Sequence, residues 1–238
     1  MSARSFELKA DGGLDTAEAG YGDDIIFWNV DTQYDFMRPD GKLPVGESEG
    51  AEDIEPALAE LTDIAQEYGI RVINTGDYHN QDSEEFSDEP DFDETYPPHC
   101  LAGSKGAEYV PATQPRNALE LDWREEPDWK EVVNHQGDFV VYKDAFDVFA
   151  GSPQSPHAEG LVETLDPDIA VVYGVATDVC VDFAVEGLLD REVEVYVVED
   201  AIKGISPENS EDAIEKWQDH GAKIGKLSEV ENYLEQVK

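Results

Sequence analysis

Five short apolar segments constrain the fold of this chain more than any other feature of the sequence. Each is nearly continuous in apolar residues and rich in β-branched or aromatic side chains, with little alternation between apolar and polar positions. Such segments are typical of parallel strands that are buried on both faces of a sheet. The five predicted strands cover residues 25–30, 71–75, 139–142, 169–173 and 193–198.

Helical patterns lie between several of these strands. Residues 53–68 place their apolar side chains on one stripe and end at Gly69, which suits a helix C-cap. Residues 178–190 and 207–220 predict two further helices. The alternation of strand and helix predicts an α/β fold with right-handed crossovers. We therefore expect a three-layer α/β/α arrangement around a central, mostly parallel sheet of six strands.

The charge of the chain limits its partners. It contains 56 acidic residues against 16 lysines and arginines, which gives a formal net charge of −40. Nucleic acid and anionic membranes repel such a chain, so neither is an expected partner. Disorder does not explain the charge, because 40% hydrophobic and 10% aromatic residues can build a core. The acid excess favours a folded protein in a high-salt cytosol, where the Debye length is about 3 Å at molar salt.

The ends of the chain and its cysteines agree with a cytoplasmic protein. Cys100 and Cys180 are too few for a disulfide framework and fit a reducing interior. Residues 1–23 predict a mobile arm without the apolar core of a signal peptide. No apolar run is long enough for a membrane span. We expect residues 24–238 to form a single domain.

Two segments interrupt the alternation, and we interpret them as loop insertions near 81–110 and 111–138. Eight of the fifteen residues in 81–95 are acids, and none is basic. Residues 111–138 contain Trp123, Trp129 and several prolines. Loops of this length are often functional or lid-like. Surface insertions adapted to salt explain each segment equally well.

Polar residues follow the apolar segments where the strands end, which is the edge at which open parallel sheets bind ligands. Asp31 and Lys143 each follow a predicted strand directly, and Cys180 lies in the first turn of a predicted helix. A helix N-terminus and a nearby lysine favour the thiolate. Taken alone, Cys180 fits a buried structural cysteine. Together with Asp31 and Lys143 at the same edge, it indicates a nucleophile.

A second group of residues has the spacing of metal ligands. Asp77 and His79 follow the strand at 71–75, and residues i and i+2 of an extended segment face the same side. His99 is the best third ligand, because the preceding Pro97 and Pro98 stiffen its segment. Two imidazoles and a carboxylate suit zinc, iron or manganese. The alternative is that both histidines lie in loops and bond to nearby acids.

With these residues in place, the sequence resembles a known family, the isochorismatase-like cysteine hydrolases, and within it the nicotinamidases. The Asp-x-Gln-x-Asp-Phe stretch that begins at Asp31 and the Gly-x-Ala-Thr-Asp-x-Cys-Val stretch that contains Cys180 are specific to the superfamily. The Asp-x-His and later Pro-Pro-His resemble the nicotinamidases in particular. The matching segments stand in the family's order at 30–36, 75–79, 96–100, 106–109, 141–143 and 174–181.

This resemblance implies a catalytic triad of Asp31, Lys143 and Cys180. Cys180 would attack a carboxamide carbon and form a thioester that water then hydrolyses. Asp31 would accept the thiol proton and pass it to the leaving ammonia, while Lys143 holds the charges in place. The resemblance also implies an oxyanion hole made of the backbone N–H groups of Ala176 and Cys180, with a cis peptide bond between Val175 and Ala176.

The resemblance further implies a divalent metal ion held by Asp77, His79 and His99, with the ion binding a pyridine nitrogen. Zinc is the first expectation, and iron or manganese are alternatives. Aromatic residues occupy the positions that flank the ring in this family, although plain core packing explains them equally well. These ring-flanking residues are Phe36, Tyr96 and Phe146.

The chain departs from the family's pattern around the ring. Tyr78 and Tyr96 stand where tryptophan is frequent. An acidic stretch replaces the family's usual further ligand, a histidine, after His79, so an acid within 82–93 is a candidate to complete the metal shell. These departures leave the identity of the amide substrate more open than the type of reaction.

The leading hypothesis is therefore a metal-assisted cysteine amidase that hydrolyses nicotinamide to nicotinate and ammonia. One alternative is a related hydrolase that acts on another small amide or ureide. Another is a metallohydrolase in which Cys180 is structural. A third is a non-enzymatic metal or redox module that uses the two cysteines and two histidines. Family members often self-associate, so the resemblance also suggests a homo-oligomer of undefined size.

Overall fold

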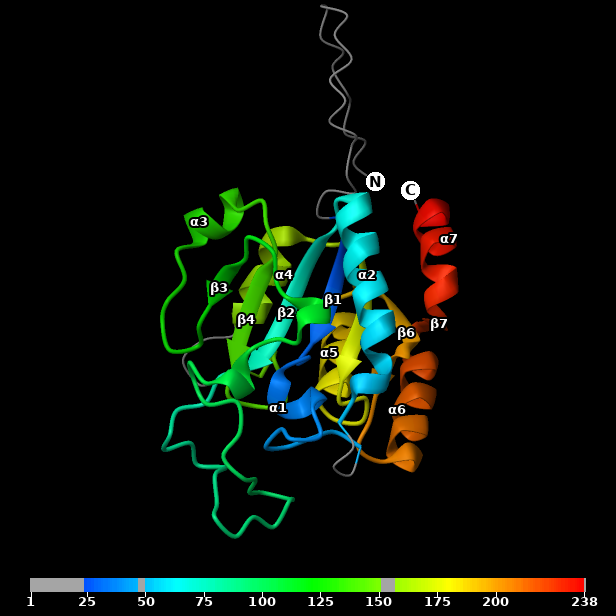
Figure 1. The fold of residues 1–238 in the computed structure, drawn as a ribbon. Helices are drawn as coiled ribbons and strands as arrows, with labels where there is room; N and C mark the ends of the chain where they lie inside the picture. The colour runs from blue at the N-terminus through cyan, green and yellow to red at the C-terminus, as the bar shows by residue number, and fades with distance from the viewer. Residues whose placement is uncertain (1–23, 47–49, 151–156, 238) are drawn as a thin grey trace, which may run out of the picture.

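A seven-stranded sheet runs through the centre of the protein in the computed structural model, which describes residues 24–46, 50–150 and 157–237 (Figure 1). Every neighbouring pair of strands is parallel. The order across the sheet is β3-β4-β2-β1-β5-β6-β7. The strands are β1 (Ile25–Val30), β2 (Arg71–Asp77), β3 (Leu119–Leu121), β4 (Phe139–Lys143), β5 (Ile169–Val175), β6 (Glu194–Lys203) and β7 (Lys223–Gly225).

The structure confirms the predicted α/β arrangement, but the predicted count of six strands is wrong. The two edge strands, β3 and β7, have three residues each. A segment this short does not carry a hydrophobic period, so neither edge is readable from the sequence. The strand β3 and the helix α3 (Trp129–Asn134) both form within 111–138. The predicted arm at 1–23 lies outside the described residues.

Helices cover both faces of the sheet, which gives the three layers. In Figure 1, α2 lies in front of the sheet, and α4 and α5 lie behind it. The front layer contains α1 (Tyr34–Met37), α2 (Glu55–Tyr68) and α7 (Leu227–Val237). The back layer contains α3, α4 (His157–Leu165), α5 (Cys180–Asp190) and α6 (Pro207–His220). Single 3₁₀ turns occur at Glu52–Ile54, Lys105–Ala107 and Pro111–Thr113.

Each face of the sheet has its own hydrophobic core. Because side chains alternate along a strand, β1 sends Trp28 into the core on one face and Phe27 into the core on the other. Trp28 stacks on Phe149, and Phe27 meets Tyr173 edge-on. Full burial of a side chain such as Phe27 contributes about 1.5–3 kcal/mol to the stability of the fold. These two cores explain why the central strands are apolar at nearly every position.

The chain order places a binding edge beside β1. From β1 the chain builds β2, β4 and β3 on one side, and it then returns to build β5, β6 and β7 on the other. Ligands bind at such switch points, outside the carboxyl ends of the strands. Asp31 follows β1, and Cys180 begins the helix that follows β5. The topology therefore brings these two residues to the same edge.

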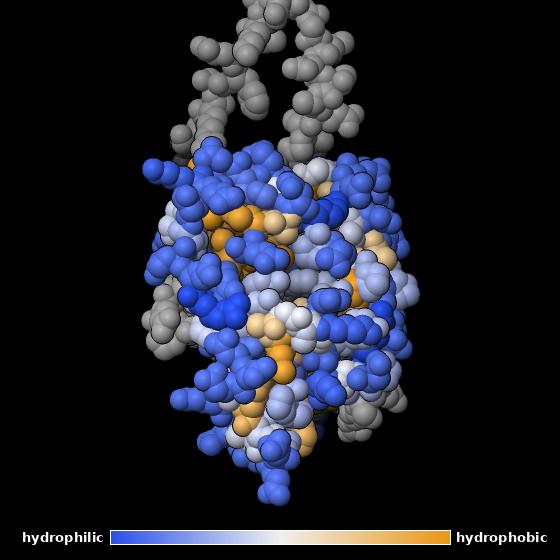
Figure 2. Space-filling view, turned by 60° about the vertical axis from the view of Figure 1, so that its left-hand side comes forward, coloured by the Kyte–Doolittle hydropathy of each residue, from blue (hydrophilic) through white to orange (hydrophobic). Residues whose placement is uncertain are grey.

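The surface of the protein is largely hydrophilic in the view of Figure 2, with a few separate apolar spots. Among the described residues, no helix has both the length and the apolar character that crossing a membrane would require.

Candidate active site

Three predicted residues, Asp31, Lys143 and Cys180, converge at the carboxyl edge of the sheet. The Nζ of Lys143 lies 2.9 Å from Oδ2 of Asp31 and 3.7 Å from the Sγ of Cys180. The hydroxyl of Thr75 donates a hydrogen bond of 2.7 Å to Oδ1 of Asp31. All three side chains are buried, with exposed fractions of 0% for Asp31, 3% for Lys143 and 8% for Cys180. The group therefore has the proximity that nucleophilic catalysis requires.

Local backbone structure positions these side chains. Asp31 has a φ of +50°, which ends the extended run of β1 and turns the chain toward α1. Lys143 is the last residue of β4. Cys180 is the first residue of α5, so its amide N–H belongs to the helix terminus and has no acceptor within the helix. The peptide bond between Val175 and Ala176, just before this turn, is cis.

The charges of the group follow from its burial. Burial acts to lower the pKa of Lys143, but the carboxylates of Asp31 and Asp77 outweigh it and raise that pKa well above its usual range. Burial raises the pKa of the Cys180 thiol, although Lys143 opposes the shift. Burial also raises the pKa of Asp31. These shifts favour the ammonium form of Lys143 and the thiol form of Cys180, against the thiolate that the helix position of Cys180 favours.

Asp77, His79 and His99 form a compact group of metal-type ligands. One ligand atom from each lies within 4.8 Å of the others, and all three residues are buried. Oδ2 of Asp77 lies 3.7 Å from Nε2 of His79 and 3.6 Å from Nε2 of His99. The Nδ1 of His99 lies 3.0 Å from the carbonyl oxygen of Pro97, and this contact orients the imidazole ring. The structure thus brings together the three predicted ligands.

Glu85 supplies a fourth candidate ligand atom, an oxygen, that the sequence did not distinguish among the acids of its stretch. Its Oε1 lies 3.3 Å from Nε2 of His79 and 3.6 Å from Nε2 of His99. Both this oxygen and Nε2 of His79 are buried without a hydrogen-bond partner. Buried polar atoms are rarely left unpaired. A divalent cation among these side chains would pair both atoms, so the residues fit zinc, iron or manganese.

The three predicted ring-flanking residues also lie together. Tyr96 and Phe146 meet edge-on with their ring centres 5.5 Å apart, and Phe36 lies 5.5 Å from the imidazole of His99. Phe86 was not among the predicted residues, yet its ring lies 5.5 Å from that same imidazole. An aromatic residue within a strongly acidic stretch is the sequence feature that could have indicated it. These rings form an aromatic border beside the metal-type ligands.

Glu85 and Tyr96 belong to one locally paired unit. The backbone N–H of Tyr96 donates to the carbonyl of Glu85 at 2.7 Å, and that of Ser87 donates to the carbonyl of Tyr96 at 2.9 Å. We call residues 81–96 the acidic loop, which projects from the lower end of the sheet in Figure 1. The acidic loop therefore carries both the fourth candidate ligand atom and part of the aromatic border.

The chain is similar in sequence to known proteins. A family model for the isochorismatase domain matches residues 119–229. The nicotinamidase/pyrazinamidase of Mycobacterium tuberculosis is 28% identical over 191 residues, which cover 79% of this chain and 91% of that protein. The nicotinamidase of Escherichia coli is 26% identical over 218 residues, which cover 85% of this chain and 94% of that protein.

The chain is also similar in structure to solved amidases. The pyrazinamidase of Pyrococcus horikoshii in complex with zinc is 26% identical with a TM-score of 0.65, covering 85% of this chain and 99% of that chain. The N-carbamoylsarcosine amidase of Thermoplasma acidophilum, at 21% identity and a TM-score of 0.63, shares the fold and covers 86% of this chain and 96% of that chain.

Proposed function

We propose that this chain, which is similar to the isochorismatase domain and to nicotinamidases, hydrolyses nicotinamide to nicotinate and ammonia. The observation that carries this proposal is the position of Lys143, which contacts Asp31, Cys180 and Asp77 at once. The nucleophile and the metal-type ligands thereby share one buried site. The nicotinamidase relatives support the choice of substrate.

The proposed reaction uses Cys180 as the nucleophile. Its sulfur attacks the carboxamide carbon while Asp31 takes the thiol proton, so that no free thiolate has to exist beforehand. Lys143 stabilises the negative charge of Asp31 before the proton transfer and the charge that develops on the sulfur while its proton leaves. The N–H groups of Ala176 and Cys180 would hold the oxyanion. Asp31 then gives its proton to the departing ammonia, and water hydrolyses the thioester with Asp31 as the base.

Asp77, His79, His99 and Glu85 would hold the divalent ion in this proposal. When bound, the ion supplies a Lewis acid that anchors the nitrogen of the substrate ring. Zinc is the proposed ion, and the zinc complex of the Pyrococcus pyrazinamidase supports it. Iron and manganese also match two imidazoles with carboxylates. The border of Phe36, Tyr96, Phe146 and Phe86 would then flank a planar ring.

The test is ammonia release from nicotinamide by the metal-loaded protein in molar KCl. We expect Cys180→Ala to lower kcat by at least about a thousandfold, and Cys100→Ala to serve as the matched control with the second cysteine changed. Undiminished turnover by Cys180→Ala would exclude the cysteine mechanism and leave a metallohydrolase.

The departures around the ring favour a second candidate, a hydrolase of another small amide or ureide. Tyr96 stands where the family more often has tryptophan, and an acidic stretch follows His79 where the family more often has a further histidine, so the ring pocket differs. A panel of nicotinamide, aliphatic amides and N-carbamoyl amino acids separates the two functions. We expect kcat/KM to be highest for nicotinamide, and a higher value for any other substrate on the panel would replace it.

The remaining expectations concern where the enzyme works. We propose a high-salt cytosol as its environment, because 56 acids against 16 basic residues suit a screened medium. The hydrophilic surface in Figure 2 supports this proposal. The mobile arm at 1–23, the single hydrolase domain at 24–238 and the homo-oligomer stay predictions.

A further inference from the structure

A cavity opens on the opposite face of the sheet from the catalytic group of Asp31, Lys143 and Cys180. It has a volume of about 470 Å³ and is bordered by the ends of β3 and β4 and by two connecting segments. Neighbouring residues of a strand point to opposite faces, so Tyr142 points into this cavity while Lys143 points to the catalytic group. The lining residues are Tyr78, Gly103, Ser104, Ala107, Glu108, Tyr109, Gln114, Pro115, Ala118, Glu120, Val140 and Tyr142.

An aromatic pair forms one wall of this cavity. The rings of Tyr78 and Tyr142 stack with their centres 4.1 Å apart and their planes 17° apart. The chain itself already places a cation against this pair, because the guanidinium of Arg124 lies 4.8 Å from the ring centre of Tyr78. Faces of aromatic rings attract cations through the electron density of the ring. The wall therefore suits a cationic ligand with an apolar or planar body.

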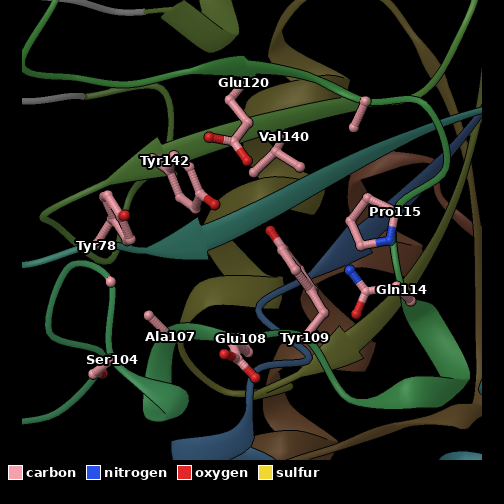
Figure 3. Close-up of a pocket in the computed structure, with 12 residues that line it drawn as sticks. Tyr78, Ser104, Ala107, Glu108, Tyr109, Gln114, Pro115, Glu120, Val140 and Tyr142 are labelled. Atoms are coloured by element: carbon pink, nitrogen blue, oxygen red, sulfur yellow. The ribbon is translucent and has the colours of Figure 1, made fainter.

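The polar atoms of the cavity are mainly hydrogen-bond acceptors. Figure 3 shows the hydroxyls of Tyr109 and Tyr142 and the carboxylate of Glu120 pointing into the same space. The hydroxyl of Tyr109 donates its proton to the carbonyl of Thr75 at 2.8 Å, so its lone pairs face the cavity. Burial raises the pKa of the Tyr142 hydroxyl, and the charge of the nearby Glu120 adds to the shift. Glu108 adds a second carboxylate.

The composition of the lining excludes several classes of ligand. The twelve described lining residues include no lysine, arginine or histidine, so they offer an anion no opposite charge. A bare divalent metal ion is also disfavoured. Among the described residues, Asp77, His79 and His99 are the group of three or more metal-type side chains close enough to ligate one ion, and they lie elsewhere. The volume falls within the range of about 300–1,000 Å³ that small-molecule sites occupy.

We propose that this cavity binds a small organic cation, namely a protonated amine or guanidinium attached to an apolar or aromatic body. The charged group pairs with Glu120, and the body lies against the ring of Tyr142. The site is separate from the amidase site and does not depend on the proposed amidase function.

The test uses three probes that share a phenyl body and differ in charge: 2-phenylethylammonium, 2-phenylethanol and 3-phenylpropionate. Binding to the full metal-loaded chain is measured by titration calorimetry in molar KCl. We expect the ammonium probe to bind at one site per chain, at least about tenfold more tightly than the alcohol, and the carboxylate not to bind. Equal affinity for the ammonium and the alcohol would overturn the proposal.

Variants then locate the site. Glu120→Gln keeps the size and polarity of the side chain while removing its charge. We therefore expect it to bring the affinity for the ammonium probe down to that of the alcohol without altering amidase turnover. Glu163→Gln, an exposed acid on α4, is the matched control and should leave binding unchanged. Equal weakening in both variants would overturn the proposal in favour of general attraction by the net charge. Competitive displacement of the probe by nicotinamide would overturn it by placing the probe in the amidase site.

Discussion

The carboxylate of Asp77 contacts Lys143 through Oδ1 and faces the two histidines through Oδ2. One side chain therefore belongs both to the charge network around the nucleophile and to the metal-type ligands. A change at Asp77 must affect both halves of the site, whereas changes elsewhere can be assigned to one half.

Asp77→Asn should separate geometry from charge at this shared position. The amide keeps a similar shape but removes the negative charge that faces both Lys143 and the histidines. We expect zinc affinity to fall by at least about tenfold and kcat to fall with it. Zinc affinity is measured by competition with a chromophoric chelator, and kcat by ammonia release. An unchanged zinc affinity would show that Asp77 is not a ligand.

Glu85→Gln tests whether the acidic loop completes the metal shell. A glutamine at this position lacks the charge that suits a divalent cation, so we expect zinc affinity to fall by about 10–100-fold. Glu84→Gln, an exposed acid in the same loop, is the matched control and should keep the affinity of the parent chain. If both variants lose affinity equally, the effect comes from the charge of the loop and not from ligation by Glu85.

The acid limb of the pH profile should report Asp31. Burial raises the pKa of this carboxyl above the ordinary value of 3.8, and the charge of Asp77 adds to the shift while Lys143 opposes it. Only the deprotonated form can accept the thiol proton, so kcat/KM should fall as the pH decreases through the raised pKa. The same shift affects stability. The buried carboxylate destabilises the fold above this pKa, and the free energy of unfolding increases as the pH falls through it. A profile that stays flat down to the ordinary value would remove Asp31 from the role of base.

Tyr96→Ala should affect substrate binding more than chemistry. The ring of Tyr96 meets Phe146 edge-on and borders the proposed ring pocket. Removing it takes away stacking area from a substrate ring, so we expect KM for nicotinamide to rise about tenfold, with a smaller change in kcat. Tyr96→Phe keeps the ring and should restore KM. A loss confined to kcat would contradict a role in binding the ring.

Gly106→Ala should destabilise the fold beside the site. A Cβ at this position would lie 1.9 Å from Oδ2 of Asp35. That carboxylate accepts hydrogen bonds from the backbone N–H groups of Lys42 at 3.0 Å and Cys100 at 2.8 Å, so it cannot move without losing them. We expect a loss of about 1–3 kcal/mol in the free energy of unfolding, measured by urea denaturation in molar salt. An unchanged unfolding midpoint would mean that the segment around Gly106 shifts freely.

The sequence was sufficient to predict the central part of the fold and the edge at which the site lies. Strands buried on both faces produce continuous apolar segments, and the residues after them share one edge because the strands are parallel. That reasoning placed Asp31, Lys143 and Cys180 together, and the structure brings them within contact distance. The edge strands β3 and β7 could not be predicted in this way, because three residues do not establish a hydrophobic pattern.

Other features depended on contacts that the sequence does not contain. Glu85 is one of eight acids in 81–95, and its position is set by backbone pairing with Tyr96 across a long turn. The state of Cys180 likewise depends on burial, which raises its pKa against the influence of the helix terminus and of Lys143. Local composition cannot decide either outcome, since both result from tertiary packing.

The backbone pairing of Glu85 with Tyr96 has a consequence for how this enzyme can diversify. A substitution that shifts Tyr96 to admit a larger ring also shifts Glu85, whose carboxylate faces the two histidines. If the proposed ion is bound there, selection for a new substrate in this lineage would also act on metal affinity. A library built on the acidic loop would best vary the two positions jointly, because neither can be optimised while the other is held fixed.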